Sequence, residues 1–136
     1  MKIVADANIL FSCLLKAGLT RRLWFHPELE LIAPAFIVKE FLKYRNELLK
    51  KYSGSEEEFE KLLSRILAQM KMVDEEDLRP YLPAAASLSS DAKDWLYLAC
   101  ALRENAQIWS HDKGFKKQIR IIIKGTEELA GEMGLL

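Results

Sequence analysis

Four acidic residues stand where a parallel α/β fold would bring side chains together: Asp6, Glu40, Asp94 and Asp112. Asp6 ends the apolar run 3–5, and Asp112 lies just past the strand expected at 107–110, so both are expected at the carboxyl ends of strands. Asp94 falls in the first turn of the helix expected before the second run, and Glu40 lies two turns into a helix that follows another strand. Ligands of open parallel sheets bind beyond the carboxyl ends of the strands, so the four carboxylates are predicted to converge there.

A cluster of carboxylates in one pocket is tolerated only when it is protonated or when it holds a cation. Ligands that are all oxygen suit Mg²⁺ or Mn²⁺, which commonly keep several waters and bind substrate phosphate. Such an ion polarises a phosphoryl oxygen and lowers the pKa of a water, while a carboxylate that is not fully engaged orients the attacking water. The pattern therefore predicts metal-dependent phosphodiester hydrolysis.

Each acid has a simpler interpretation when it is taken alone. Asp6 could be only a helix N-cap, and Asp112 could only form a turn with Gly114. Asp94, with Asp91 before it, could only interact with the helix dipole. Glu40 could be an ordinary exposed helix residue, so it is the ordered combination that favours a metal site.

The hydrophobic pattern predicts strands that alternate with helices almost throughout the chain. Strands are expected at 3–5, 29–33, 107–110 and 119–123, with a weaker candidate at 71–73. Helices are expected from Asp6 or Asn8, from Thr20, over 34–51, over 55–70, from Ser89 or Ser90 to 105, and over 126–133. Residues 75–88 are predicted to be irregular because Pro80 and Pro83 prevent a long helix. This order predicts an α/β fold, a three-layer α/β/α sandwich with a central, mostly parallel, Rossmann-like sheet of four or five strands.

Composition and length restrict the possibilities further. The 136 residues suit a single domain, 1–136, with a helical arm at about 45–70. The 20 Lys and Arg residues balance the 20 Asp and Glu residues, so affinity for nucleic acid must come from a local patch. Cys13 and Cys100 lie in apolar runs without a CxxC pair, which indicates buried thiols. No apolar run is long enough to span a bilayer, and residues 2–5 look like a strand and not a signal peptide, so the cytoplasm is expected.

Four segments of the chain together resemble the PIN-domain nucleases, including the VapC-type toxin ribonucleases of prokaryotic toxin–antitoxin pairs. The segments are 4–12 with its Asp-x-Asn, 33–41 around Glu40, 91–102, and 108–115 around Asp112. They occur in the family's order and span nearly the whole chain. The resemblance implies a PIN-like α/β/α fold.

The resemblance also implies a Mg²⁺- or Mn²⁺-dependent endoribonuclease whose metal and catalytic residues are the four acids named above. It implies Asn8 and Ser110 as supporting groups, with Ser110 standing where the family commonly has Thr. The third acid could be Asp91 or Asp94; Asp94 is preferred because alanines follow it by five and seven residues, and Asp91 is kept as a helper or cap. The implied partners are RNA, an antitoxin protein and a second copy of the chain.

Basic residues on segments that leave the metal end of the predicted sheet are expected to contact RNA phosphates. They are Lys16, Arg21, Arg22, Lys39 and Lys113. Single-stranded RNA is favoured because its scissile phosphate must reach recessed carboxylates. Helical faces around Leu14, Leu23 and Trp24 are a candidate dimer contact, whereas His26 and His111 are expected to be structural.

Two other functions remain open at this point. A receiver-like phosphorylation domain also places acids at strand ends, but it would need an acceptor aspartate after the third strand, where only Asp74 stands. A non-catalytic RNA- or protein-binding module could keep the same fold, although all four acids are present. A dinucleotide-binding domain is disfavoured because no GxGxxG follows the first strand.

Overall fold

Five parallel strands form the central sheet of the computed structural model, which describes residues 1–136. In spatial order they run β3-β2-β1-β4-β5, and every neighbouring pair is parallel. Their bounds are β1 (Lys2–Ala5), β2 (Glu30–Pro34), β3 (Met70–Val73), β4 (Gln107–Trp109) and β5 (Ile123–Lys124). The predicted parallel sheet is confirmed, and it has five strands.

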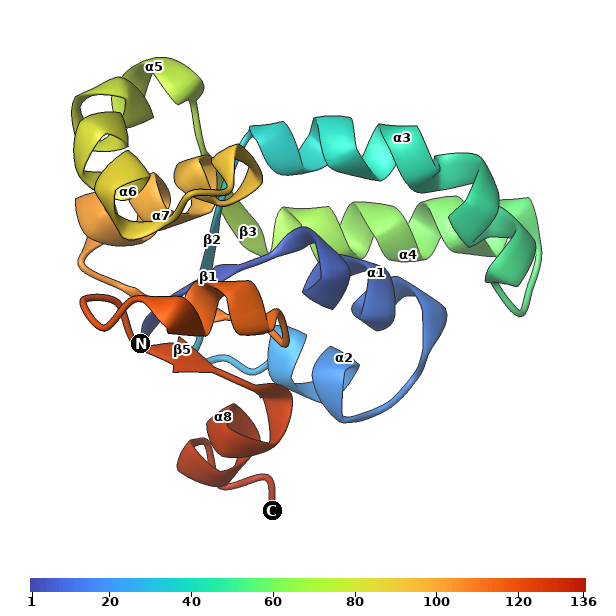
Figure 1. The fold of residues 1–136 in the computed structure, drawn as a ribbon. Helices are drawn as coiled ribbons and strands as arrows, with labels where there is room; N and C mark the ends of the chain where they lie inside the picture. The colour runs from blue at the N-terminus through green and yellow to red at the C-terminus, as the bar shows by residue number, and fades with distance from the viewer.

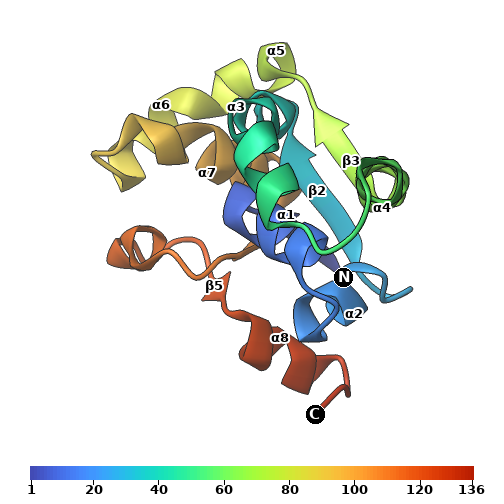
Figure 2. The ribbon, with the colours of Figure 1, turned by 90° about the vertical axis from the view of Figure 1, so that its right-hand side faces the viewer.

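Helices cover both faces of the sheet, which confirms the three-layer architecture (Figures 1 and 2). Helix α7 (Ala92–Glu104) packs against β1, β2 and β4, with the short helices α5 (Glu75–Leu78) and α6 (Leu82–Leu88) beside it. On the other side lie α1 (Ala7–Leu15), α2 (Leu19–Trp24), α3 (Phe36–Lys51) and α4 (Glu56–Ala68), and α8 (Thr126–Glu132) packs on α2. Central strands covered on both faces must be apolar throughout, which explains why Ile3, Val4 and Ala5 are all fully buried.

The strand order places a topological switch point between β1 and β4. From β1 the chain runs outward through β2 and β3, and then returns across the sheet to β4 and β5. Crevices at such switch points are where open α/β sheets bind ligands. Receiver-like folds have the order 2-1-3-4-5, in which the third strand neighbours the first. Here β4 takes that place, so the receiver-like alternative is wrong.

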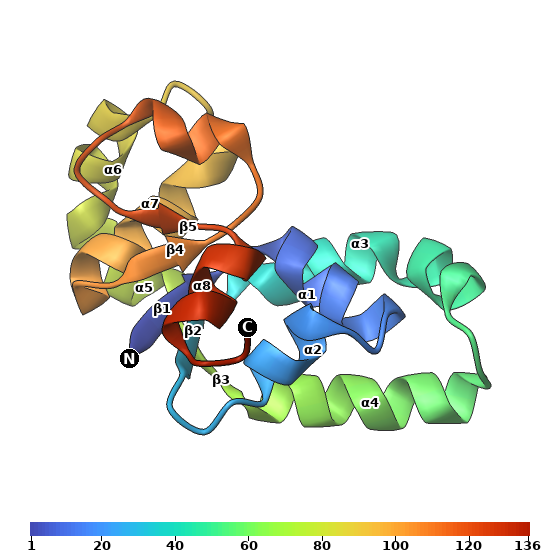
Figure 3. The same ribbon diagram turned by 90° about the horizontal axis from the view of Figure 1, so that it is seen from below.

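Helices α3 and α4 form a hairpin that extends past the sheet, where the helical arm was expected (Figures 1 and 3). Phe59 of α4 is fully buried between Phe41 and Tyr52, at ring-centroid distances of 6.3 and 5.4 Å. Ser55 and Glu58 form the capping box that begins α4. Helix α1 packs against both arm helices, so Phe59 belongs to the same buried cluster as the sheet.

The prediction that residues 75–88 are irregular is wrong, because they form α5, the 3-10 helix η1 (Arg79–Tyr81) and α6. Pro80 and Pro83 each lie in the first turn of a short helix, where the missing N–H needs no partner. The prolines therefore divide the segment without unwinding it.

Several expected boundaries also shift. Helix α3 begins at Phe36, α2 is preceded by Gly18 and not capped by Thr20, and α7 is capped by Asp91 and not by Ser89 or Ser90. The expected strand at 119–123 shrinks to Ile123–Lys124, and the side chain of Ile119 is fully exposed. An apolar run marks a strand only where a neighbouring strand is there to receive its hydrogen bonds.

The predicted dimer face around Leu14, Leu23 and Trp24 is wrong, because all three side chains are buried within the chain. Trp24 packs against Trp109, and its indole N–H donates to the carbonyl of Ile66 at 2.9 Å. An apolar helical face indicates that something covers it, and here the covering elements belong to the same chain. Both cysteines are free and buried, as predicted. No helix combines the length and the apolar character that crossing a bilayer requires.

Phe59 anchors the arm, so truncating it should destabilise the protein. Phe59→Ala is expected to lower the free energy of unfolding by about 3–5 kcal/mol through lost burial and the cavity it leaves. Leu42→Ala is the matched control on α3, where the residue is 60% exposed, and should change it by less than about 0.5 kcal/mol. Urea denaturation followed by circular dichroism measures both, and equal midpoints would show that the arm does not depend on this contact.

Candidate functional site

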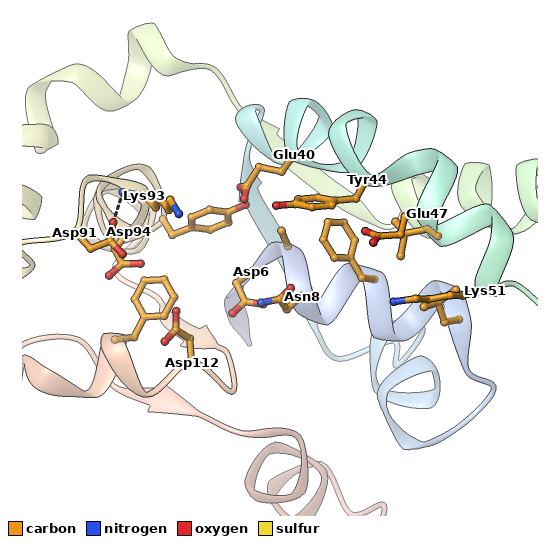
Figure 4. A pocket seen from close by; sticks show the side chains of 16 residues that line it. Asp6, Asn8, Glu40, Tyr44, Glu47, Lys51, Asp91, Lys93, Asp94 and Asp112 are labelled. Atoms are coloured by element: carbon orange, nitrogen blue, oxygen red, sulfur yellow. Dashed lines mark hydrogen bonds between the residues drawn. The ribbon is translucent and has the colours of Figure 1, made fainter.

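A pocket of about 500 Å³ opens at the carboxyl edge of the sheet, and all four predicted acids line it (Figure 4). They come from four elements: the residue before α1, the second turn of α3, the first turn of α7 and the residue before the 3-10 helix η2 (Lys113–Lys117). Asn8 and Asp91 line the same pocket. The fold therefore brings together residues from nearly the whole length of the chain.

Asp6 is held by hydrogen bonds from two elements. Its Oδ1 accepts from the backbone N–H of Ile9 at 2.9 Å, which makes Asp6 the N-cap of α1. Its Oδ2 accepts from the hydroxyl of Ser110 at the end of β4. Ser110 Oγ also accepts from the backbone N–H of Asp112 at 2.9 Å. Ser110 does not line the pocket, and instead fixes Asp6 relative to the loop that carries Asp112.

Asp91 and Asp94 have different surroundings, which bears on the choice between them. Asp91 is exposed and uses Oδ1 to cap α7 through the N–H of Lys93, at 3.0 Å. Asp94 is only 6% exposed, and Ser89 Oγ donates to its Oδ2 at 3.0 Å. Asp91 thus serves as the N-cap of α7, whereas Asp94 is a buried carboxylate on the pocket wall.

Tyr97 is a pocket residue that the sequence analysis did not assign to the site. Its hydroxyl donates to Glu40 Oε1 at 2.5 Å, across 57 residues of sequence, and its ring is buried. Tyr97 follows Asp94 by three residues, so both lie on the same face of α7. That spacing is the signal that could have placed Tyr97 in the site.

Burial and the repulsion of neighbouring acids disfavour the charged forms of Asp6, Glu40 and Asp94. Burial raises the pKa of Asp6, and the charge of Asp112 raises it further, against the hydrogen bonds from Ser110 and Ile9. Burial likewise raises the pKa of Glu40, with a contribution from Asp6 that the Tyr97 hydrogen bond opposes. Burial also raises the pKa of Asp94, as do Asp91 and Asp112.

The carboxylates of the pocket have the chemistry that a hard divalent cation requires, but they do not lie at the distances of direct ligands. No group of three or more Asp, Glu, His or Cys side chains is placed to hold a metal ion directly. Each of Glu40, Asp94 and Asp112 does keep one carboxylate oxygen free of hydrogen bonds, namely Oε2, Oδ1 and Oδ2. Mg²⁺ commonly binds one or two carboxylates and retains its waters, so these free oxygens suffice in number and chemistry. A cation there would also relieve the repulsion among the acids.

The basic residues of the pocket are not those that were expected to contact RNA. None of the five expected residues lines the pocket, and Arg21 donates to the carbonyls of Cys13 and Leu14 at the end of α1. The lysines that line the pocket are Lys51 and Lys93. His111 contacts Thr126 Oγ1 at 2.7 Å and does not line the pocket, in keeping with its expected structural role.

Comparisons with known proteins identify the same fold and a family. The family model described as "PIN domain" matches residues 4–131. A chain of the VapBC2 complex from Rickettsia felis, solved bound to a DNA fragment from its promoter, superimposes with a TM-score of 0.69 at 16% identity. The superposition covers 92% of this chain and 98% of that one. No curated protein matches the chain significantly.

The burial of Asp6 predicts a conflict between stability and metal binding. In metal-free protein at neutral pH, Asp6→Asn should raise the melting temperature by roughly 2–8 °C, the shift that about 1 kcal/mol produces in domains of this general size. Asn keeps the oxygen that caps α1 and removes a buried charge. Burial raises the pKa of Asp6 above 3.8, so the folded wild type loses stability as the pH rises through that raised pKa and Asp6 becomes charged. Below pH 3.8 Asp6 is neutral, as Asn is, so the melting temperatures of the two proteins should converge there.

Saturating Mn²⁺ should then raise the melting temperature of wild type more than that of Asp6→Asn, because only wild type offers the full carboxylate set. Differential scanning fluorimetry with EDTA or MnCl₂ measures both effects. A variant that is less stable without metal, with an unchanged response to Mn²⁺, would contradict a role for Asp6 in a cation site.

Proposed function

The chain belongs to the PIN-domain family, and from that membership we propose that it is a Mg²⁺- or Mn²⁺-dependent endoribonuclease that hydrolyses phosphodiester bonds in single-stranded RNA. The observation that carries the proposal is the convergence of Asp6, Glu40, Asp94 and Asp112 on one pocket at the switch point of the sheet. A recessed acidic pocket suits a flexible strand better than a rigid duplex, because the scissile phosphate must enter it.

In this proposal Asp6, Glu40, Asp94 and Asp112 together would hold the cation, with Glu40 contributed by α3. The ion, when bound, acts as a Lewis acid on the phosphoryl oxygen and makes a water more acidic. Ser110 fixes the orientation of Asp6, and Ser89 does the same for Asp94. Tyr97 engages Glu40 Oε1, which leaves Oε2 to accept a hydrogen bond from the attacking water. Lys93 lines the pocket, is exposed and belongs to no ion pair, so it attracts the phosphate, and Asn8 supplies an amide next to Asp6.

We further propose that the chain is the toxin of a toxin–antitoxin pair, acts in the cytoplasm, and has an antitoxin protein as its partner. The support is structural likeness over nearly the whole chain to a component of a VapBC complex. Homodimerisation is part of the same proposal, through a surface other than the buried face around Trp24.

A non-catalytic binding module on the same fold is the second candidate. The observation that favours it is that the acids, as they stand, do not form a direct metal site. Cleavage and thermal response to Mn²⁺ separate the two candidates, since a binding module would show neither.

Exchanging single aspartates should separate the catalytic acid from the helix cap. With Mn²⁺ and a mixed single-stranded RNA pool, Asp94→Asn is expected to lower the cleavage rate by about 100-fold or more, and Asp6→Asn to act similarly. Asp91→Asn is the matched control on the same helix, and it should retain most activity because Asn caps a helix as well as Asp does.

Gel-resolved cleavage time courses measure these rates, with circular dichroism to verify folding. Equal cleavage by wild type and Asp94→Asn would exclude this site as the source of activity. Loss of activity in Asp91→Asn alone would assign the third acid to Asp91.

If basic residues contact RNA phosphates, added salt should lower the kcat/KM of RNA cleavage. We expect the logarithm of kcat/KM to fall linearly with the logarithm of the salt concentration, by a slope of about 0.7 for each phosphate contact on a single strand. Alanine at Lys16, Arg22, Lys39 or Lys113 should reduce that slope by about 0.7 wherever the residue makes such a contact. A flat salt response in wild type would rule out the expected phosphate contacts.

A further inference from the structure

The pocket continues beyond the acids into a groove between α1 and α3. Phe11 and Leu15 of α1 line one wall of this extension. The other wall is a stripe along α3 made of Tyr44, Glu47, Leu48 and Lys51. Figure 4 shows Lys51 at the end of the groove remote from the acids, beyond Glu47. Nothing in the proposed hydrolytic chemistry uses these side chains.

Glu40 of the acidic pocket lies on the same helix as this stripe and continues it toward the proposed reaction centre. Glu40, Tyr44, Glu47 and Lys51 are spaced by four, three and four residues, so they occupy one face of α3. At 1.5 Å per residue, the stripe runs about 16 Å from the first to the last. A strand whose phosphate reaches the acids can therefore lay the adjoining nucleotide over Tyr44 and Glu47.

On the basis of the proposed ribonuclease function, we propose that this groove is a base-binding subsite, in which an unpaired guanine next to the scissile phosphate stacks on Tyr44, donates to Glu47, and has its far phosphate bound by Lys51. The ligand is one nucleotide of single-stranded RNA. Tyr44 forms the aromatic position of the groove, Glu47 the acceptor position and Lys51 the cationic position.

The ring at the aromatic position packs against a neighbouring aromatic side chain and is still partly exposed to solvent. Phe11 packs edge-on against Tyr44 with ring centroids 5.7 Å apart and an interplanar angle of 64°. Tyr44 nevertheless remains 39% exposed, so part of its ring is available to a ligand. The exposed side chain of Lys43 reaches over that ring, with Nζ 5.4 Å from the ring centre, so a base that stacks there displaces this flexible side chain. A ring supported on one side by a second aromatic is suited to base stacking, which tolerates any base.

The charged side chains at the acceptor and cationic positions form no ion pair within the protein. Glu47 and Lys51 are exposed and four residues apart on one helix, but neither belongs to any of the ion pairs in the structure. An ionised carboxylate only accepts hydrogen bonds, so Glu47 selects a base edge that donates them. Guanine presents N1–H beside its N2 amino group and fits a carboxylate with two parallel bonds, whereas uracil offers one donor. Lys51 supplies a point charge suited to phosphate.

A polypeptide is the other ligand that a half-apolar groove can receive. The nucleotide is favoured because the groove is continuous with the acidic pocket. Its order of acid, ring, acceptor and cation also matches the order of scissile phosphate, base face, base edge and next phosphate along one strand. Leu15 and Leu48 contribute the apolar part of the lining, against which the sugar can lie.

Binding and cleavage test the subsite separately. Binding of fluorescein-labelled hexanucleotides, each with a single guanine, adenine, cytosine or uracil in oligo-A or oligo-C, is followed by anisotropy in EDTA, where no cleavage occurs. Cleavage of the same RNAs with Mn²⁺ gives kcat/KM for each base. The variants are Tyr44→Ala, Tyr44→Phe, Glu47→Gln and Lys51→Ala. The matched controls are Leu42→Ala and Lys50→Ala, exposed residues on α3 that do not line the groove.

Tyr44→Ala should weaken binding and lower kcat/KM by about 10-fold or more, while Tyr44→Phe should stay within about twofold of wild type, because stacking and not the hydroxyl is used. Glu47→Gln should erase the preference for guanine without abolishing binding. Lys51→Ala should weaken binding to all four RNAs and reduce the salt slope by about 0.7. Both controls should remain within about twofold.

The subsite is overturned if wild type cleaves RNA and Tyr44→Ala and Lys51→Ala match their controls in both assays. It is also overturned if these variants keep RNA binding but lose affinity for a purified antitoxin polypeptide, since the groove would then serve a protein. If wild type binds the hexanucleotides through Tyr44 and Lys51 but cleaves none with Mn²⁺, the proposed ribonuclease function fails and the subsite stands.

Discussion

The concentration of negative charge at one edge of the sheet is the constraint on which the rest of the site depends. Buried carboxylates repel one another and lose hydration, so each must be held by hydrogen bonds or by a cation. Ser110, Ser89 and Tyr97 each donate to one acid, and each donor comes from an element packed beside the pocket. These bonds fix the acids individually but do not neutralise them. The remaining charge is what a divalent ion would balance, which makes stability and metal affinity opposing properties of the same residues.

The parallel sheet makes this concentration of charge possible. Because all strands run the same way, the residues that follow β1 and β4 emerge at the same edge, and the switch point makes these two strands neighbours. Ser110 and Asp6, 104 residues apart in the chain, are consequently in hydrogen-bond contact. Helices α1 and α7 both begin at that edge, and their positive ends face the acids. The fold thus supplies both the crowding and part of its compensation.

Helix α3 connects the stability of the arm to the site. Its inner face packs through Phe41 on Phe59 of α4, and its groove-facing side presents Glu40, Tyr44 and Lys51 in sequence. A helix spaces such side chains rigidly, so the packing of the arm sets the distance between the acids and the proposed base-binding subsite. The arm, which lies outside the central sheet, thus carries both Glu40 of the proposed ion site and the residues of the proposed subsite.

The sequence by itself determined most of the strands, the main helices, the family and the four acids that line the pocket, because apolar runs, helical spacing and short motifs are local patterns. It left the choice between Asp91 and Asp94 open, because both lie at the start of the same helix. Their surroundings differ only in the folded chain, where Asp91 accepts from the Lys93 N–H and Asp94 accepts from the Ser89 hydroxyl. It misassigned Leu14, Leu23 and Trp24, since an apolar face looks the same whether its own chain or another covers it. The partners of Glu40 and Asp6, 57 and 104 residues away, were decided by the order of the strands, because no local pattern specifies which distant segments become neighbours.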